Sequence, residues 1–526
     1  MRKFTKMMVA GAVLASLLAP QSALAAAPAP TLKNDNPSAK FGDWYVGAVP
    51  PNVDYSRPVI LFVQGLHSDY TTWYNSDGFY DAAYSAGYRT AFVQLKDADG
   101  TGGDMWVNGS KLAEVITKVK NYYGVSKINI VAHSKGGIDT QTALVHYGAY
   151  PYVNLVHQLS TPNRGSELAD LCYSSWTWWI AELMGQRDDA TYVLQTSYMD
   201  YFRSVTDGLT QNKSTRTYMS GGTGDDGILS STFYSRAVLP GEDDGAVSIA
   251  SAFGLPNGYY GFTDNGSERL SHTKMRWASK TWWQVKPRLT TTSYAAIAPT
   301  AIASTSYMEK KSVNEASSNI MRGGEINGKV VDTFTLESKA TAYVDVMTSK
   351  SDTSVALVSP SGKVYRPTRG ENKLDDNAVL FTDAVHNIFS IKGEAGTWTL
   401  QAEGDQDAYF MLANVEGGAK SKVKSAKKSF KKGEKVELGV ELQGGKLDGK
   451  NKKQKQAKLS KSGKQSAQEV TLTEQADGTL TSSFVAPTEP GVYNISFDVT
   501  GTNDKGESFT RSVNYNFAVL DENGKL

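Results

Sequence analysis

The sequence of 526 residues contains only one cysteine, Cys172, so no disulfide can form within the chain. The fold must therefore be stabilised by buried apolar side chains, which a chain of this length can supply. Cys172 stands in an aromatic-rich stretch, and no nearby histidine or acid has the spacing of a metal ligand or a catalytic dyad. We expect it to be a small buried apolar residue.

An excess of charge of one sign is also absent. The 55 Lys and Arg residues against 54 Asp and Glu give a formal net charge of +1, so nothing suggests nucleic acid or an anionic membrane as a partner. No Cys and His spacing indicates zinc, and we expect neither a metal nor an organic cofactor. A hydrophobic share of 40% and a charged share of 21% are typical of a soluble globular protein.

Long apolar runs are absent beyond the N-terminus. There, residues 1–6 are basic, residues 7–20 are apolar or small, and Ala23-Leu24-Ala25 has the pattern of a cleavage signal. This order predicts that residues 1–25 form a signal peptide and that the mature protein is secreted and extracellular. The alternative, a membrane anchor, is disfavoured because the apolar run is shorter than the roughly 20 residues that a span needs.

Residues 37–285 alternate two kinds of apolar pattern. Short runs rich in apolar and β-branched residues at 59–63, 89–95, 128–131 and 153–159 predict buried strands. Helical spacing follows several of them, as in residues 110–123. This rhythm predicts an α/β fold with a doubly wound, mostly parallel sheet that helices cover on both faces.

The rest of the chain differs in composition and in the pattern of its apolar residues. Residues 286–306 are small, polar or Pro-containing and predict a linker. Residues 307–418 and 419–526 carry short alternating strands separated by Gly and Pro turns, which predicts two small all-β sandwiches. The cadence of Asp477-Gly478 followed by Pro490-Gly491-Val492-Tyr493 resembles bacterial immunoglobulin-like modules.

The last module begins with a lysine-rich stretch, with 16 lysines between 420 and 464. Such a run forms either a solvated face or a contact with a polyanion, and a solvated face is the commoner outcome. For a secreted protein, a cell wall or an insoluble substrate is a conceivable partner of these C-terminal modules.

A serine lies where a predicted strand turns into a predicted helix. The strand at 128–131 leads into Ala132-His133-Ser134-Lys135-Gly136-Gly137, and residues 138–146 have helical spacing. Small residues two positions before and two positions after Ser134, Ala132 and Gly136, are what a tight nucleophile elbow needs, because the strained turn leaves no room there for larger side chains. The helix N-terminus then favours negative charge beside the serine hydroxyl.

This hexapeptide resembles the elbow of bacterial lipases and esterases of the α/β-hydrolase superfamily, especially those of Bacillus type, with Ala132 where glycine is commoner. Gln64-Gly65-Leu66 is similar to their oxyanion loop, with Gln64 in place of His. The stretch at 160–166 is similar to their G-T-P-H-x-G-S stretch, with Asn163 in place of His, and 243–248 to their N-D-G-x-V-S acid loop. The four motifs occur in the expected order and cover about half of the chain.

The resemblance implies a Ser, Asp, His triad in that order along the chain. Asp244 aligns with the acid position, and Asp243 is the fallback. His272 is the base by elimination. Of the other five histidines, His67 and His133 precede the nucleophile, and His146 lies on the helix after it. His157 lies on a strand before the acid loop, and His386 lies in a β module.

The oxyanion hole is expected to use the backbone N–H groups of Leu66 and Lys135. The side chain of Lys135 is expected in solvent, or else in contact with a substrate carboxylate. Trp176, Trp178 and Trp179 lie where this fold places its lid, and they are either an aromatic wall for an apolar substrate or core residues. Some related lipases bind calcium through an aspartate after the catalytic histidine, but Thr273 and Lys274 stand there.

Together these features predict an extracellular carboxylic ester hydrolase, a triacylglycerol lipase or esterase that works through an acyl-enzyme. An aliphatic polyester (polyhydroxyalkanoate) depolymerase has the same chemistry, and the accessory modules would suit its insoluble substrate. A third alternative, from another class, is a non-catalytic surface-binding protein on a hydrolase scaffold.

Overall fold

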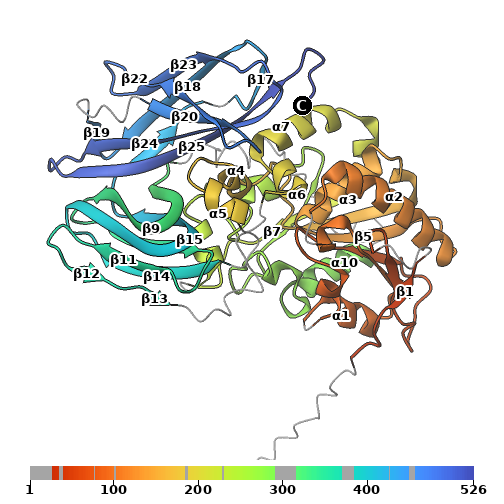
Figure 1. The fold of residues 1–526 in the computed structure, drawn as a ribbon. Coiled ribbons are helices and arrows are strands. Elements are labelled where there is room, and N and C mark those ends of the chain that lie inside the picture. Colours follow the sequence, from red (N-terminus) through yellow and green to blue (C-terminus); the bar gives the residue numbers. More distant parts are fainter. Residues whose placement is uncertain are drawn as a thin grey trace, which may run out of the picture.

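The computed structural model describes residues 26–34, 40–75, 77–99, 102–183, 187–227, 230–290, 316–369, 384–425, 427–448 and 456–526. An α/β domain forms one side of the molecule and two β domains form the other (Figure 1). The predicted signal peptide, residues 1–25, lies outside the described ranges. Within them, no helix is both long and apolar enough to cross a bilayer.

The first domain is built on an eight-stranded sheet in the order β1-β2-β4-β3-β5-β6-β7-β8. All neighbours from β4 onward are parallel, and the two edge strands β1 and β2 are antiparallel. The predicted mostly parallel sheet is thereby confirmed. Its strands are β1 (Thr31–Lys33), β2 (Trp44–Val46), β3 (Ile60–Val63), β4 (Thr90–Val93), β5 (Ile128–His133), β6 (Val153–Leu159), β7 (Arg216–Gly221) and β8 (Tyr259–Thr263).

Helices cover both faces of this sheet, as the unbroken apolar strands require. Leu61 and Val63 of β3 pack in one core with α2 (Met105–Tyr122) and α3 (Lys135–Val145). Ile60 and Phe62, which point to the opposite face, pack in another core with α1 (Phe79–Ser85) and α10 (Trp283–Thr290). Short turns complete the layer: η1 (Tyr70–Trp73), η2 (Lys96–Asp99), η3 (Tyr150–Tyr152), η4 (Thr210–Lys213), η5 (Lys274–Arg276), the π-helical η6 (Ala278–Trp282), α8 (Ser231–Ser235) and α9 (Ile249–Ala252).

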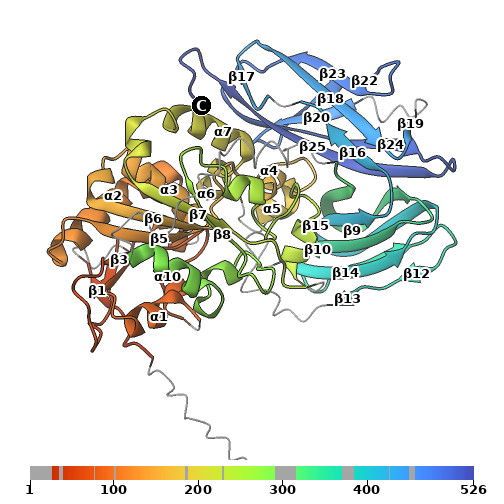
Figure 2. The ribbon, with the colours of Figure 1, turned by 180° about the vertical axis from the view of Figure 1, so that it is seen from behind.

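Four helices between β6 and β7 form a layer that we call the lid. They are α4 (Glu167–Cys172), α5 (Trp178–Leu183), α6 (Asp189–Val193) and α7 (Thr196–Thr206). Both views show α4 and α5 between the sheet and the β domains (Figures 1 and 2). Leu171, Cys172 and Ile180 pack with Phe410 and Leu412 of the first β domain, so the lid is covered from outside.

Residues 286–290, which were expected to begin the linker, instead belong to α10. Val285 and Leu289 are four residues apart, lie on one side of the helix and are buried against the sheet. Pro287 within this helix and the threonines after it conceal the short apolar pattern. The remainder of the predicted linker, 291–306, lies outside the described residues.

The first β domain consists of one antiparallel sheet that is bent, so that its inner face encloses an apolar core. Two long strands, β9 and β15, pair along their whole length and bend where the register shifts between Gly404 and Asp407. Trp398 and Phe334 from these strands are central to the core. The strands are β9 (Asn319–Leu336), β10 (Thr341–Thr348), β11 (Ser354–Val358), β12 (Val364–Tyr365), β13 (Thr368–Arg369), β14 (Val385–Lys392) and β15 (Gly396–Glu416).

The second β domain is a sandwich of a four-stranded and a six-stranded sheet, in agreement with the predicted all-β fold. In its lysine-rich part, Lys424 pairs with Glu441 at 2.7 Å and Lys464 with Glu489 at 2.9 Å, which favours a solvated face. The strands are β16 (Lys420–Val423), β17 (Ser429–Lys431), β18 (Lys435–Gln443), β19 (Lys446–Leu447), β20 (Gln456–Lys461), β21 (Ala467–Thr471), β22 (Thr473–Glu474), β23 (Leu480–Val485), β24 (Gly491–Thr502) and β25 (Ser508–Leu520).

Candidate active site

Ser134 lies between β5 and α3 in a strained backbone conformation. Its φ of 54° and ψ of −132° are values that residues with a Cβ rarely adopt, and such strain persists only where the surroundings impose it. The Ser134 N–H donates to the carbonyl oxygen of Leu159 on the neighbouring strand at 2.9 Å. The sequence therefore forms the sharp strand-to-helix turn that the motif predicts.

Two glycines allow this turn to pack closely. A Cβ at Gly136 would lie 2.1 Å from the carbonyl oxygen of Gln64, and one at Gly137 would lie 2.0 Å from the Thr161 Oγ1 atom. Both distances are far below a van der Waals contact, so larger residues would push α3 away from the loop after β3, which contains Gln64, and from the segment after β6, which contains Thr161. Gly136 thus allows α3 and Ser134 to lie against the loop that contains Leu66.

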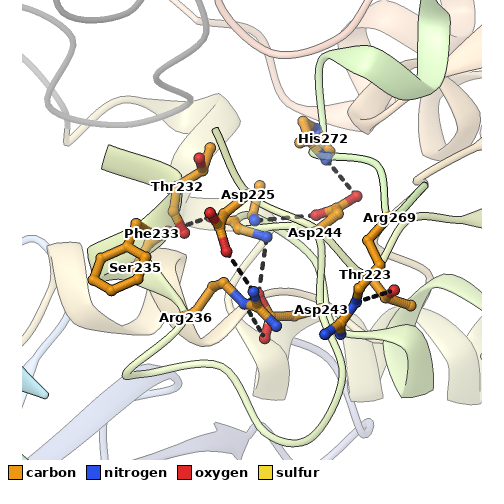
Figure 3. Close-up of polar contacts among 12 residues, drawn as sticks. Thr223, Asp225, Thr232, Phe233, Ser235, Arg236, Asp243, Asp244, Arg269 and His272 are labelled. Atoms are coloured by element: carbon orange, nitrogen blue, oxygen red, sulfur yellow. Dashed lines mark hydrogen bonds and ion pairs between the residues drawn. The ribbon is translucent and has the colours of Figure 1, made fainter. Parts of the chain in front are cut away.

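His272 and Asp244 form a buried pair, with exposed fractions of 2% and 1%. His272 Nδ1 lies 3.0 Å from Asp244 Oδ2, and the His272 N–H donates to the Asp244 carbonyl oxygen at 2.8 Å (Figure 3). The other carboxylate oxygen accepts from the N–H groups of Ala246 and Val247 at 3.1 and 2.8 Å. The carboxylate thus holds a proton on Nδ1, which leaves Nε2 as the basic nitrogen.

The fallback acid, Asp243, points to a different partner. Its carboxylate lies 3.3 Å from Arg236, which also pairs with Asp225 at 2.5 Å (Figure 3). Burial raises the pKa of Asp243 to about 7, although Arg236 opposes this shift. The structure therefore brings Asp244, and not Asp243, to His272.

Ser134 and His272 line one small cavity together with Leu66. Its volume of about 20 Å³ is room for about one water molecule and far too little for an acyl chain. The remaining lining residues are apolar or small and come largely from the lid and the acid loop: Pro162, Ser166, Leu168, Ala169, Thr191, Leu194, Ala246 and Val247. His272 Nε2 has no hydrogen-bond partner among the described residues. The cavity between Ser134 and His272 is therefore closed.

The loop after β3 approaches Ser134 directly. A Cβ at Gly65 would lie 2.9 Å from the Ser134 Cβ. In the described part of the chain, the N–H groups of Leu66 and Lys135 donate to no protein atom. Free N–H groups on both sides of a serine are what an oxyanion hole requires.

The two residues that depart from the family motifs have structural partners. With its amide oriented to satisfy both neighbours, Gln64 donates to the Val93 carbonyl and accepts from the Leu95 N–H, each at 2.7 Å. Asn163 donates to Gln158 Oε1 and to the Ala252 carbonyl, each at 2.9 Å. Amides at these positions thus fix loops around the site.

The Lys135 side chain is fully buried, so the expectation that it lies in solvent is wrong. Its Nζ atom lies 3.0 Å from both carboxylate oxygens of Asp139 and 3.2 Å from Asp97 Oδ2. Burial opposes the charge, but the two carboxylates outweigh it and raise the pKa of Lys135. The ammonium group points into the protein and not toward a substrate.

The aromatic wall expected from Trp176, Trp178 and Trp179 is also not formed, because none of the three lines the cavity. Trp176 packs with residues of the first β domain, and the Arg187 guanidinium lies 3.4 Å from the ring centroid of Trp178. Trp179 is 37% exposed. The short helix α5 packs against β9 and β15 of the first β domain, and the cavity is lined by α4 and α6 instead.

Sequence reasoning missed His133, the residue before the nucleophile. Its Nε2 atom lies 3.0 Å from the His272 carbonyl oxygen, and the two imidazole centroids are 4.6 Å apart. Burial, with a smaller effect of His272, holds the pKa of His133 well below its usual range. A neutral His133 therefore donates to the main-chain carbonyl oxygen of His272. The position of His133 within the elbow motif was the one feature of the sequence that could have indicated this contact.

The lid is fastened to the second β domain by a cluster of amides and hydroxyls. Gln195 Oε1 accepts from Ser462 Oγ at 2.8 Å, from Asn516 Nδ2 at 3.1 Å and from Asn494 Nδ2 at 3.4 Å. The main-chain N–H of Ser197 donates to Asn516 Oδ1 at 3.0 Å. Both β domains thus contact the lid, which covers the cavity.

No family model and no curated protein matches the chain, but solved structures resemble it. Among solved structures, a Bacillus licheniformis lipase, BlEst2, in its propeptide form is 24% identical, with 93% of this chain and 99% of that chain covered and a TM-score of 0.69. Its mature form is 35% identical over 48% of this chain and 100% of that chain, with a TM-score of 0.43.

Aspergillus fumigatus lipase B is a more distant neighbour, with 18% identity, 34% of this chain and 40% of that chain covered, and a TM-score of 0.26. The likeness to the propeptide-form lipase extends over nearly the whole chain, so the catalytic-type domain and both β domains share one overall fold with it. By its fold the chain belongs to the α/β-hydrolases, and the resemblance stated from the four motifs is confirmed.

Proposed function

We propose that the protein is a serine hydrolase that cleaves carboxylic esters. The observation that carries this proposal is the shared cavity of Ser134 and His272, with His272 Nδ1 bonded to Asp244 and Nε2 unbonded. A strained serine beside a histidine that a buried carboxylate orients is the arrangement of an activated nucleophile. The lipase-like fold supports the same reaction class.

In the proposed mechanism, His272 Nε2 takes the Ser134 proton as Ser134 Oγ attacks the ester carbonyl carbon. The resulting oxyanion accepts hydrogen bonds from the N–H groups of Leu66 and Lys135. Its collapse breaks the ester bond, and the alcohol leaves with the proton from His272, so Ser134 carries the acyl group. Water, deprotonated by His272, then attacks the acyl carbon and releases the carboxylic acid, which restores Ser134.

The substrate class is proposed from the cavity walls. Leu66, Leu168, Leu194 and Val247 are apolar, and among the described residues no Asp, Glu, Lys or Arg side chain lines the cavity, which suits an apolar acyl group. We therefore favour a lipase or esterase. An aliphatic polyester depolymerase remains the second candidate, and initial rates on short-chain esters, emulsified triglyceride and polyester film would separate the two.

Replacing Ser134 with Ala tests the proposed chemistry. The variant is expected to lose p-nitrophenyl butyrate cleavage and labelling by a fluorophosphonate probe. A matched control is Ser160→Ala, because Ser160 also follows a sheet strand, has a φ of 52° and is buried. Labelling that persists in Ser134→Ala and disappears in Ser160→Ala would mean that the nucleophile is misassigned. No labelling of the wild-type chain in any form would favour the non-catalytic alternative.

We also propose that the full chain is a secreted precursor whose β domains keep the site closed. The neighbour described as a lipase in propeptide form has a matching overall fold. The cavity of about 20 Å³ and the contacts of both β domains with the lid support the same idea. Limited proteolysis that separates the β domains should raise the labelling rate of Ser134, and an unchanged rate would contradict this proposal.

A further inference from the structure

One short segment of the sheet contacts both loops that supply the proposed oxyanion N–H groups. Residues 93–97 form the end of β4 and the start of η2. The Val93 carbonyl and the Leu95 N–H hold the Gln64 amide, two residues before Leu66, at 2.7 Å each. The Asp97 carboxylate, two residues further on, lies 3.2 Å from Lys135 Nζ.

The second of these contacts is part of a buried polar cluster. Lys135 is bound on its own helix by Asp139, with both carboxylate oxygens 3.0 Å from Nζ. Asn108 of α2 donates to Asp97 and, at 3.2 Å, to Asp139, while its carbonyl oxygen accepts from the Lys96 N–H at 3.2 Å. The exposed fractions of Lys135, Asp97, Asn108 and Asp139 are 0, 2, 0 and 1%. The cluster thus joins η2, α2 and the first turns of α3.

Stability alone does not account for such a cluster. Taking an ammonium and two carboxylates out of water is costly, and apolar residues of similar size often stabilise a core equally well or better. The charged cluster includes the first residue of α3, Lys135, which directly follows Ser134 and whose N–H is one of the two proposed oxyanion donors. A buried ionic group in this place has a use in fixing the position of the main chain.

We propose that Lys135 is a positioning residue: its side chain, held by Asp97 and Asp139, fixes its own backbone N–H in the oxyanion hole beside Ser134. This inference rests on the proposed ester hydrolysis. With Gln64 bound to the same segment, residues 93–97 set the spacing between the N–H groups of Leu66 and Lys135.

The effect of losing the cluster follows from the geometry of an oxyanion hole. Removal of one donor lowers kcat by about 10²–10³, and a misplacement of about 1 Å costs about 10². Substrate binding depends mainly on the apolar walls, so KM should change little. A boronic acid forms a tetrahedral adduct with a serine hydroxyl and places an oxygen in the same hole, so its inhibition should weaken in parallel with kcat.

The test compares Lys135→Met with a matched control, Arg511→Met. Arg511 is also 0% exposed and pairs with Glu337 at 2.8 Å, but it lies between the two β domains. For each full-length variant, kcat and KM on p-nitrophenyl butyrate, the inhibition constant of butylboronic acid and the melting temperature are measured. In Lys135→Met, kcat should fall about 10²-fold with KM changed less than about threefold, and boronate inhibition should weaken by a similar factor.

A second variant covers the case in which an unpaired carboxylate prevents folding. Lys135→Met combined with Asp97→Asn and Asp139→Asn removes all three charges, and it should fold yet keep the loss of kcat and of boronate affinity. Either folded variant overturns the inference if its kcat and boronate inhibition stay within about threefold of Arg511→Met. A wild-type chain that shows neither turnover nor fluorophosphonate labelling, both before and after proteolysis separates the β domains, overturns the proposed function itself, which is a distinct result.

Discussion

His67 Nε2 lies 2.5 Å from Asp188 Oδ2, and this contact joins the loop after β3 to the lid. His67 follows Leu66 in the proposed oxyanion loop and has a left-handed backbone with a φ of 48°. Asp188 is the N-cap of α6, where its other carboxylate oxygen accepts from the Thr191 N–H at 2.7 Å. Burial would raise the pKa of Asp188, but the hydrogen bond and charge of His67 outweigh it and the pKa is lowered.

Weakening this contact should open the site. Asp188→Asn keeps an N-cap acceptor and removes the charge that holds His67. If the closed lid loses about 1 kcal/mol, the open population and the fluorophosphonate labelling rate of the full chain should rise about fivefold. The control is Asp189→Asn, which changes the neighbouring acid of the same turn. Equal labelling rates in the two variants would show that the His67 contact does not restrain the lid.

The two adjacent acids should differ sharply in their effect on activity. Asp244→Asn is expected to lower kcat by about 10⁴, as loss of the orienting carboxylate does in a well-studied serine protease, because the amide favours the wrong imidazole tautomer. Asp243→Asn should leave kcat within about threefold, because Asp243 pairs with Arg236. Steady-state kinetics on p-nitrophenyl butyrate measures both. A larger loss in Asp243→Asn would reverse the assignment.

Lowering the pH should stabilise the contact between the lid and the β domains, because Glu167 then takes up a proton. Burial, together with nearby Asp170, raises the pKa of Glu167 to about 7, while Lys428 of the second β domain opposes the shift. Because the folded pKa exceeds the unfolded value near 4.3, the folded state binds the proton more tightly. Its stability is therefore greatest below about pH 4 and falls as pH rises toward 7.

Glu167→Gln removes this titration. The free energy of unfolding of the variant, relative to that of wild type, should increase by up to about 3 kcal/mol as the pH rises from 5 to 8. Its melting temperature should therefore exceed that of wild type by more at pH 8 than at pH 5. Glu182→Gln is the control, because that lid side chain is 65% exposed. A pH-independent difference between Glu167→Gln and wild type would contradict the raised pKa.

Gln195 should be important for holding the last β domain. Gln195→Ala leaves the buried amides of Asn494 and Asn516 and the hydroxyl of Ser462 without their shared acceptor, at a cost of about 1–3 kcal/mol. Hydrogen exchange should then increase in α6, α7 and β24 while α2 stays protected. Gln211→Ala is a suitable comparison, because Gln211 is half-buried in η4. Unchanged exchange in the lid would mean that apolar contacts alone hold the β domain.

Much of the first domain could be predicted because its strands are buried on both faces. The apolar run at 59–63 and the mainly apolar run at 128–131 have few alternative structures, and the elbow motif follows the second of them. By contrast β7 and β8 carry no such run, because Arg216, Thr217 and Ser220 interrupt β7 and Gly261 interrupts β8. Their place in the sheet depends on tertiary pairing that a local pattern does not encode.

The site itself shows the same division. Alignment with the acid loop brought Asp244 forward, elimination brought His272 forward, and the structure brings these two together. The solvated Lys135 and the aromatic wall, one of the two interpretations of the tryptophans, differ from the structure for a common reason. A lysine after a nucleophile looks solvated unless Asp97, 38 residues earlier, is known to lie beside it. The tryptophans look like a substrate wall unless the β domain that covers α5 is known.

The left-handed backbone of Ser134 has a consequence for evolution as well as for chemistry. A side chain at such a φ costs of order 1–3 kcal/mol, and glycine would relieve most of it. The proposed nucleophile therefore occupies the position where folding alone would select a different residue. Ser134→Gly should melt at a higher temperature than wild type, so a lineage released from selection for activity would drift toward a more stable, inert protein.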